Sequence, residues 1–309
     1  MLLSIYGSHD GCVTYTKNNK IIFHTQIDRY NKFKHTTFPA KELVRTLETL
    51  DIDLFLLSNN RWHTINLWTD FISVSKKLKK TPIINYEARY HHLFHAYCSL
   101  TWNKNCKNIL VCDGNGTYAK TFYEQESRYT FDGKLKHITT EANKIGFKYE
   151  KFTEKHFEHE LECGKTMAWS LYDERPKAVQ DTYEKEMTEL IDRWQLKDDV
   201  IFTGGCAQNV LYNSILLDRF NNLFCDPFNG DFGLRLGAIN LYTNNSITNK
   251  EIYLGIPQEV NTDLFLKHKI IDVESDDVAK VLLKEPIAIF QSRSEQGQRG
   301  LGNRSLLMN

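Results

Sequence analysis

The hydrophobic pattern of the first hundred residues predicts strands followed by helices. Residues 2–30 predict two strands joined by a polar Asn-Asn-Lys turn, and the first of them contains a Gly-Ser-His-Asp-Gly corner at 7–11. Residues 40–58 combine a helix-period pattern with a short buried strand, and residues 81–102 predict a further strand and a helix. This mixture is typical of an α/β protein.

The second half of the chain repeats this order. Residues 103–141 begin with an apolar strand that ends in Asp-Gly-Asn-Gly, and two more strands follow around a Phe-Asp-Gly-Lys turn. Residues 151–197 are mostly helical, and 198–220 predict a strand, a Gly-Gly turn and a helix. We therefore expect a duplicated actin-like ATPase (RNase H-like) fold, with subdomains at 1–105 and 106–255.

Composition narrows the class of protein. The 309 residues carry 39 basic and 39 acidic side chains, so no overall field attracts nucleic acid or a membrane surface. No apolar run approaches the length of a membrane span. Seven scattered cysteines contain no Cys-x-x-Cys pair and predict free thiols in a reducing compartment. We expect a cytoplasmic protein with neither a membrane nor a nucleic-acid partner; a homodimer is the common default for an enzyme of this size.

Three histidines crowd into the predicted helix at "HHLFHA". His91 and His95 are separated by four residues, so a helix directs both imidazoles from the same face, whereas His92 points elsewhere. Two imidazoles at this spacing suit one transition metal. Carboxylates or water would then complete the coordination shell of that metal. The alternative is a pair of core or capping histidines.

Two aspartates are candidate partners for such a metal. Asp113 in "VCDGNGT" and Asp231 in "DPFNGDFGLRLGA" both lie beside glycines at predicted strand-to-loop corners. The alternative for each is an aspartate that stabilises a tight turn through its own backbone.

Other segments carry candidate chemistry. Gly204 and Gly205 lie at the start of a predicted helix that carries Asn209 and Asn213 on one face, an arrangement that suits a nucleotide but also a plain strand–helix connector. His9 in "SHDG" has a side chain that titrates near neutrality and so suits a general base toward a hydroxyl, the alternative being a hydrogen-bonded turn histidine. Arg293 and Arg299 lie in a glycine-rich tail whose guanidinium groups suit phosphate, unless the tail is disordered.

The order of these segments is more specific than any one of them. The succession "SHDG", "DRYNKFKHTTFP", "HHLFHA", "VCDGNGT", "GKTMAWSLY", "TGGCAQNVLYN", "DFGLRLGA" and "EQGQRGLGNRS" resembles the O-carbamoyltransferase family of antibiotic and nodulation-factor biosynthesis. The resemblance runs from residue 3 to residue 309. It implies a first domain similar to the tRNA threonylcarbamoyl-transfer protein, in agreement with the duplicated pattern.

The resemblance also implies a reaction. A second, C-terminal domain makes carbamoyl-adenylate from carbamoyl phosphate and ATP, and the first domain moves the carbamoyl group to a hydroxyl of a small acceptor with the help of a divalent metal, Fe²⁺ or alternatively Zn²⁺. The matching positions are His91, His95 and Asp231 for the metal; His9 for the general base; Lys34, Asp113, Gly114, Gly204, Gly205 and Asn209 for the nucleotide; and Arg293 and Arg299 for the carbamoyl-phosphate side.

Residues 256–309 correspond to the start of the C-terminal domain. We therefore expect this chain to carry the transfer half-reaction, with a separate domain or subunit supplying the adenylate. Two alternatives remain: a non-catalytic partner subunit that binds metal and nucleotide, and tRNA threonylcarbamoyl transfer, against which the neutral charge speaks.

Overall fold

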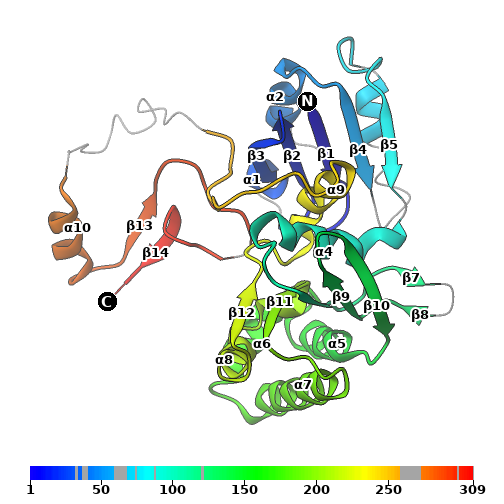
Figure 1. Cartoon of the computed structure of the whole chain (residues 1–309). Helices are drawn as coiled ribbons and strands as arrows, with labels where there is room; N and C mark the ends of the chain where they lie inside the picture. The colour runs from blue at the N-terminus through cyan, green and yellow to red at the C-terminus, as the bar shows by residue number, and fades with distance from the viewer. Residues whose placement is uncertain are drawn as a thin grey trace.

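The computed structural model describes residues 1–31, 34–36, 41–58, 68–73, 75–86, 88–119, 122–257, 273–297 and 299–308. Two five-stranded sheets form the body of the molecule, one above the other in Figure 1. The first sheet contains β1 (Leu2–Tyr6), β2 (Cys12–Lys17), β3 (Lys20–Gln26), β4 (Leu54–Ser58) and β5 (Ile83–Tyr86). The second contains β6 (Asn108–Cys112), β9 (Glu126–Phe131), β10 (Leu135–Glu141), β11 (Asp199–Thr203) and β12 (Asn222–Cys225).

The two sheets share one topology. Their strand orders are β3-β2-β1-β4-β5 and β10-β9-β6-β11-β12. In each, the first three strands pair antiparallel and the last three pair parallel. The chain therefore has the duplicated actin-like ATPase (RNase H-like) fold of the α/β class, as the sequence pattern predicts.

One detail of the first sheet differs from the expectation. The corner at residues 7–11 separates β1 from β2, so residues 2–26 form three strands and not two. Asp10 has a φ of 54°, a left-handed conformation that cannot continue a strand. The corner therefore turns the chain, and it places His9 at the end of β1.

Helices cover the outer faces of both sheets. In the first half, α2 (Lys41–Thr49) buries Leu43 and Leu47, one helical turn apart, against the strands. In the second half, α5 (Ile145–Phe157) and α7 (Glu174–Arg193) pack on β6 and β11 through a shared apolar core. Further elements of the body are α1 (Asp28–Asn31), α6 (Cys163–Trp169) and α8 (Val210–Arg219), with a small ladder of β7 (Tyr118–Ala119) and β8 (Phe122–Tyr123).

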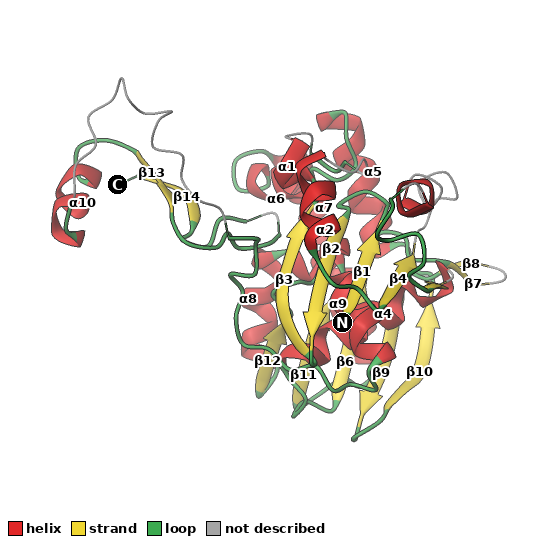
Figure 2. Ribbon diagram, turned by 90° about the horizontal axis from the view of Figure 1, so that it is seen from above, coloured by secondary structure: helices red, strands yellow, loops and turns green. Residues whose placement is uncertain are grey.

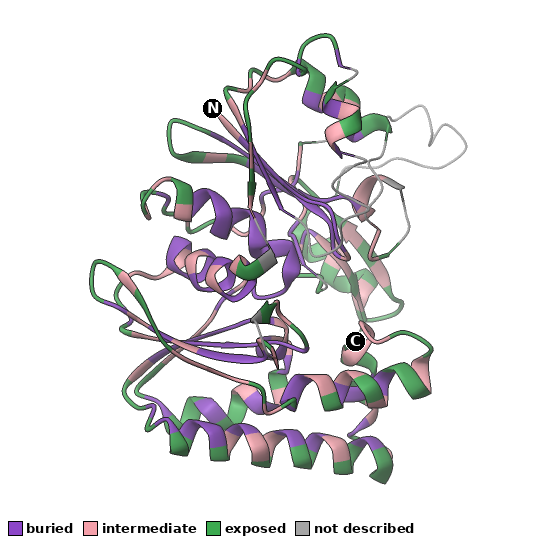
Figure 3. Ribbon diagram, turned by 90° about the vertical axis from the view of Figure 1, so that its right-hand side faces the viewer, coloured by how far each residue is buried: buried purple, intermediate pink, exposed green. Residues whose placement is uncertain are grey.

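The last helix of each half packs on the sheet of the other half. Helix α4 (His91–Trp102), preceded by the 3₁₀ turn η1 (Ala88–Tyr90), packs on the second sheet, where Leu100 meets Ile109. Helix α9 (Leu234–Tyr242) packs on the first sheet, where Ile239 meets Leu56. The two helices form the buried layer between the sheets, visible as the purple zone in Figure 3. Helix α4 carries His91 and His95 at its N-terminal end, and Asp231 lies just before the start of α9.

The C-terminal residues lie largely apart from this body. Helix α10 (Ser275–Leu282) and the antiparallel pair of β13 (Ile287–Phe290) and β14 (Arg304–Leu307) project away from the sheets in Figures 1 and 2. The segment between β13 and β14 returns to the first sheet, where Gln26 accepts a hydrogen bond from the Gly297 N–H at 2.9 Å. No described helix is both long and apolar enough to span a bilayer.

Candidate metal centre and its cavity

The first turn of α4 brings two imidazoles together. The Nε2 atoms of His91 and His95 lie 3.3 Å apart, as expected for side chains one helical turn from each other. Both side chains are buried. His92 instead meets the Ser127 hydroxyl with its Nδ1 at 2.7 Å, on the other side of the helix. The helix therefore presents two of its three histidines to one point.

Two aspartates from the second half converge on the same point. Asp113 follows β6, and its Oδ2 lies 2.9 Å from His91 Nε2 and 3.3 Å from His95 Nε2. Asp231 begins the 3₁₀ turn η3 (Asp231–Gly233), and its Oδ1 lies 3.3 and 3.6 Å from the same two nitrogens. Asp113, a candidate partner for the metal that the family resemblance also places beside the nucleotide, thus faces the histidine pair directly.

The cluster has the chemistry of a metal site. One ligand atom from each of His91, His95, Asp113 and Asp231 lies within 4.8 Å of the other three. Two imidazole nitrogens and two carboxylate oxygens form a donor set that suits divalent transition metals. Among the residues that the structure describes, no other group of three or more histidine, cysteine or acidic side chains converges in this way.

The charges at the cluster also favour a cation. Burial lowers the pKa of His91, but the facing Asp231 and Asp113 carboxylates more than offset this effect and raise the pKa to about 10. Burial raises the pKa of Asp231, yet the neighbouring histidines hold that pKa well below its ordinary value. The histidines also lower the pKa of Asp113, so both aspartates stay ionised and protons on the histidines balance them. A divalent cation at the cluster would take the place of those protons.

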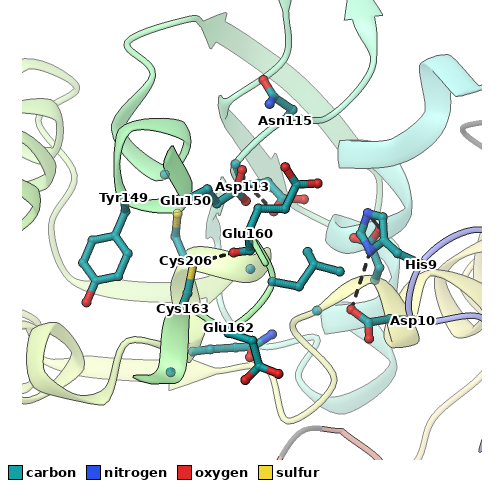
Figure 4. A pocket seen from close by; sticks show the side chains of 18 of the residues that line it. His9, Asp10, Asp113, Asn115, Tyr149, Glu150, Glu160, Glu162, Cys163 and Cys206 are labelled. Atoms are coloured by element: carbon teal, nitrogen blue, oxygen red, sulfur yellow. Dashed lines mark hydrogen bonds and ion pairs between the residues drawn. The ribbon is translucent and has the colours of Figure 1, made fainter. Parts of the chain in front are cut away.

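The cluster adjoins a large cavity lined by both halves. The cavity has a volume of about 1140 Å³, and Asp113 and Asp231 are part of its wall. Figure 4 shows His9 and Asp10 on one side and Glu150, Cys163 and Cys206 on the other. Of the residues singled out from the sequence, those that line the cavity are His9, Lys34, Asp113, Gly114, Gly205, Asn209, Asp231 and Arg299.

His9 reaches the cavity from the corner after β1. Its Nε2 lies 3.3 Å from Asp231 Oδ2, and its Nδ1 lies 3.6 Å from Asp10 Oδ2. Burial lowers the pKa of His9, but the Asp231 and Asp10 carboxylates raise it to about 9. At this pKa the imidazole carries a proton at neutral pH and cannot act as a base. A base role therefore requires another cation beside the carboxylates, which would reduce their effect on the pKa of His9.

The Gly-Gly turn packs against the Asp113 corner. Gly204 has a φ of 89°, and a Cβ there would lie 2.3 Å from the Cys112 carbonyl oxygen. A Cβ on Gly205, the first residue of the 3₁₀ turn η2 (Gly205–Gln208), would lie 2.8 Å from Asp113 Oδ1. Gly204 is absent from the cavity wall, so its role is to allow the turn, whereas Gly205 faces the cavity.

Asn209 caps a helix and also lies at the cavity wall. It is the N-cap of α8, where its Oδ1 accepts a hydrogen bond from the Tyr212 N–H at 3.1 Å. Its amide also exchanges two hydrogen bonds with Gln180, at 2.9 and 3.1 Å. The side chain is thus fixed within the protein while its edge lines the cavity.

The basic residues separate into two groups. Lys34 and Arg299 line the cavity, where Lys34 pairs with Glu162 at 3.0 Å and Arg299 donates to the Gln208 carbonyl at 3.3 Å. The guanidinium of Arg293 lies elsewhere. It donates to backbone carbonyls of β3 and of the end of the second half: Ile22 at 2.5 Å, Gly255 at 2.7 Å and Leu254 at 2.9 Å. Arg293 therefore anchors the C-terminal segment.

Sequence reasoning overlooked several cavity residues. Arg29 and Arg304 both donate to the Gly297 carbonyl, at 2.7 and 3.0 Å, and both line the cavity. Glu150 on α5 also lines it, and burial together with Asp113 raises the pKa of its carboxyl to about 8. Arg29 and Arg304 lie in the motifs "DRYNKFKHTTFP" and "EQGQRGLGNRS", so the sequence contains a signal for both arginines. Glu150 lies in an ordinary helical pattern and has no such signal.

Comparison with known proteins gives limited matches. No family model matches the chain. An uncharacterized protein of Methanocaldococcus jannaschii is 32% identical over 148 residues, which cover 42% of this chain and only 28% of that protein. The chain therefore matches less than a third of the length of this relative.

Three solved structures share a distant likeness. The activator of the 2-hydroxyisocaproyl-CoA dehydratase from Clostridium difficile with bound ADPNP is 13% identical with a TM-score of 0.43, and the match covers 81% of this chain and 98% of that one. Component A of the (R)-2-hydroxyglutaryl-CoA dehydratase of Acidaminococcus fermentans is 10% identical with a TM-score of 0.44, and the match covers 76% of this chain and 94% of that one. HypF of T. kodakarensis is 8% identical with a TM-score of 0.45, and the match covers 80% of this chain and 49% of that one. The assignment of the fold rests on the duplicated strand order of the two sheets.

Proposed function

We propose that this chain transfers a carbamoyl group from carbamoyl-adenylate to a hydroxyl of a small-molecule acceptor, using a divalent metal held by His91, His95, Asp113 and Asp231. The observation that carries the proposal is the convergence of these four side chains beside a cavity that His9 also lines. The cavity, at about 1140 Å³, has room for a nucleotide together with an acceptor. Iron is the first candidate and zinc the second.

The reaction divides into a few defined events. The acceptor oxygen forms a bond to the carbamoyl carbon, and the bond from that carbon to the phosphate oxygen breaks. AMP leaves with the bonding electrons, and the hydroxyl proton passes to a base, which we assign to His9. A divalent metal at the cluster supplies positive charge that offsets the charge of the phosphate.

Basic residues of this chain are suited to hold the adenylate. Arg299 and Arg304 line the cavity, and their hydrogen bonds to backbone carbonyls leave further guanidinium donors for a phosphate. Arg29 also lines the cavity, where its guanidinium pairs with Asp28 and donates to Gln26. Lys34 lies on the same wall, paired with Glu162. The Gly205 backbone supports the proposal further, because the absence of a side chain allows a ligand to approach the Asp113 corner.

A partner domain or subunit would make the adenylate from carbamoyl phosphate and ATP. The C-terminal residues support this part of the proposal because their apolar side chains are exposed. Helix α10 has no buried residue. Leu283, Phe290, Leu306 and Met308 are between 60 and 83% exposed. Such a concentration of exposed apolar side chains is typical of a surface that another folded unit covers.

The decisive experiment supplies carbamoyl-adenylate directly. Metal-loaded protein is mixed with the adenylate and with pools of sugars, nucleosides or tRNA, and the release of AMP is measured. We expect release that depends on one small-molecule pool, and a loss of about 100-fold or more in His9→Ala, which still binds the adenylate.

Three other outcomes contradict the proposal in different ways. Release that depends on tRNA alone supports threonylcarbamoyl-type transfer. Tight binding of the adenylate without release in any pool supports the non-catalytic partner subunit. Full activity of His9→Ala removes His9 from the role of base.

A further inference from the structure

We infer that Tyr6, braced by Arg235, is a positioning residue that leaves only one oxygen of Asp231 to face the histidine pair. The inference rests on the metal site of the proposed function and names a determinant of its affinity. Neither residue carries a signal for this role in the sequence, because Tyr6 lies in an apolar strand and Arg235 lies in a helix.

The two oxygens of Asp231 have different partners. Oδ1 faces the Nε2 atoms of His91 and His95, at 3.3 and 3.6 Å. Oδ2 accepts a hydrogen bond from the Tyr6 hydroxyl at 2.8 Å and lies 3.3 Å from His9 Nε2. Because Tyr6 and His9 occupy Oδ2, the carboxylate presents Oδ1 alone to the cluster.

Burial holds Tyr6 in this place. It is the last residue of β1, its side chain is 1% exposed, and it packs in the apolar cluster that contains Phe94, Phe228 and Phe232. A buried phenol that donates to a carboxylate fixes the plane of that carboxylate, since a charge-assisted hydrogen bond is directional and stronger than a neutral one.

Arg235 braces the tyrosine ring. Its guanidinium carbon lies 5.1 Å from the ring centroids of both Tyr6 and Phe94, within the range of a cation–π contact. Its Nη1 donates to the Ile5 carbonyl at 3.2 Å, and its Nη2 donates to the Ser58 hydroxyl at 2.6 Å. The guanidinium therefore links β1, β4 and α4 around the tyrosine.

The setting of Arg235 is unusual for a charged side chain. It is fully buried, and in the part of the chain that the structure describes no carboxylate oxygen lies within 4.0 Å of its nitrogens. A buried guanidinium without a carboxylate partner is costly. Its place against Tyr6, one helical turn after Asp231, gives this charge a function in fixing the ligand.

The test compares two tyrosine variants. Tyr6→Phe removes the hydroxyl that binds Asp231 and keeps the ring that packs on Arg235. Tyr15→Phe is the control, because Tyr15 lies on the neighbouring strand and its hydroxyl donates to the Asp51 carbonyl at 2.9 Å, away from the cluster. For each protein the dissociation constant of Co²⁺, the visible absorption of the Co²⁺ form and the melting temperature of the metal-free form are measured.

We expect Tyr6→Phe to bind Co²⁺ about 10- to 100-fold more weakly, as is usual when a partner of a metal ligand is removed. Its absorption spectrum should also change, because the phenol no longer fixes the plane of the Asp231 carboxylate and His9 alone remains on Oδ2. Tyr15→Phe should keep the wild-type constant and spectrum even where its melting temperature falls as much as that of Tyr6→Phe.

The outcomes separate this inference from the proposed function. Wild-type affinity and spectrum in Tyr6→Phe overturn the role of Tyr6 and leave the metal site standing. A wild-type protein that binds none of Co²⁺, Fe²⁺ and Zn²⁺ overturns both. A parallel loss in Tyr6→Phe and Tyr15→Phe shows a general structural effect and also overturns the inference.

Discussion

Asp113 and Asp231 each direct one carboxylate oxygen at the same histidine nitrogen, His91 Nε2, at 2.9 and 3.3 Å. They follow different strands of the second sheet, whereas the histidine belongs to a helix from the first half. Each aspartate taken alone has the appearance of an ordinary turn residue. Their shared target makes the pair a candidate site, and it leads to predictions that distinguish neighbouring side chains.

The first prediction concerns the histidines of α4. His95→Ala should lower the iron or zinc content of purified protein from near one ion per chain to below about a tenth, because it removes one of two nitrogen ligands. His92→Gln is the matched control, since His92 meets Ser127 and lies outside the cluster. Equal metal content in the two variants, measured by elemental analysis, would show that the cluster holds no metal.

The second prediction concerns the fourth side chain of the cluster. Asp113→Asn should weaken metal binding about 10- to 100-fold, because the amide that replaces the carboxylate carries no charge. Glu150→Gln makes the same acid-to-amide change in the same cavity but outside the cluster, and it should keep the wild-type affinity. Titration with Zn²⁺ provides the measurement. If Asp113→Asn binds as tightly as wild type, Asp113 serves only the nucleotide side.

The third prediction separates two arginines that the sequence groups together. Arg293→Ala should lower the free energy of unfolding by about 1–3 kcal/mol, because it breaks hydrogen bonds to three backbone carbonyls. Arg299→Ala should change stability by less than about 0.5 kcal/mol and should weaken the binding of the adenylate. Urea unfolding measures the stability of each variant, and calorimetry measures its binding of the adenylate. The reverse pattern would contradict the placement of both side chains.

The fourth prediction contrasts two glycines. Gly204→Ala should destabilise the protein by about 3 kcal/mol or more, because its φ of 89° is strained for alanine and the clash is with backbone at Cys112. At Gly114 a Cβ would lie 1.6 Å from Glu150 Oε1, the far end of a flexible side chain. Gly114→Ala should therefore cost less than about 1 kcal/mol while it displaces the Glu150 carboxylate. Similar unfolding midpoints for the two variants would refute this account.

The fifth prediction concerns acid stability. His24 is fully buried, its Nδ1 lies 2.7 Å from the Thr14 hydroxyl, and burial lowers its pKa to about 3. The unfolded chain takes up a proton near pH 6.5, whereas the folded protein does not. The stability present above pH 6.5 is therefore lost as the pH falls toward 3, by about 1.4 kcal/mol per pH unit for this one proton.

His24→Phe removes that proton and keeps the stacking on Phe228. Urea unfolding at pH 7 and pH 4.5 should show a smaller loss of stability in the variant than in wild type. The variant leaves the Thr14 hydroxyl without its partner, which lowers the free energy of unfolding equally at both pH values. This cost therefore cancels in the difference between pH 7 and pH 4.5. His137→Phe changes an exposed histidine and serves as the control. An unchanged acid dependence in His24→Phe would exclude His24 as a source of acid sensitivity.

The sequence predicts the fold and part of the site for definite reasons. The repeated pattern of strands and the spacing of His91 and His95 are local properties, so both can be deduced from the order of residues. The sequence offers Asp113 as a candidate ligand, but its distance from the histidines depends on how β6 packs against α4, and no short segment of sequence predicts this contact. Arg293 and Tyr6 show the same limit, because their roles follow from partners far along the chain.

Helices α4 and α9 each pack on the sheet of the other half, and this arrangement has a consequence for folding. The four side chains of the cluster come from both halves and are far apart in the unfolded chain, so the unfolded state has no comparable site for an ion. An ion that binds only the native state stabilises it by mass action, by about 2.7 kcal/mol at a free concentration 100 times the dissociation constant. The resistance of this protein to unfolding would then vary with the metal supply of its surroundings.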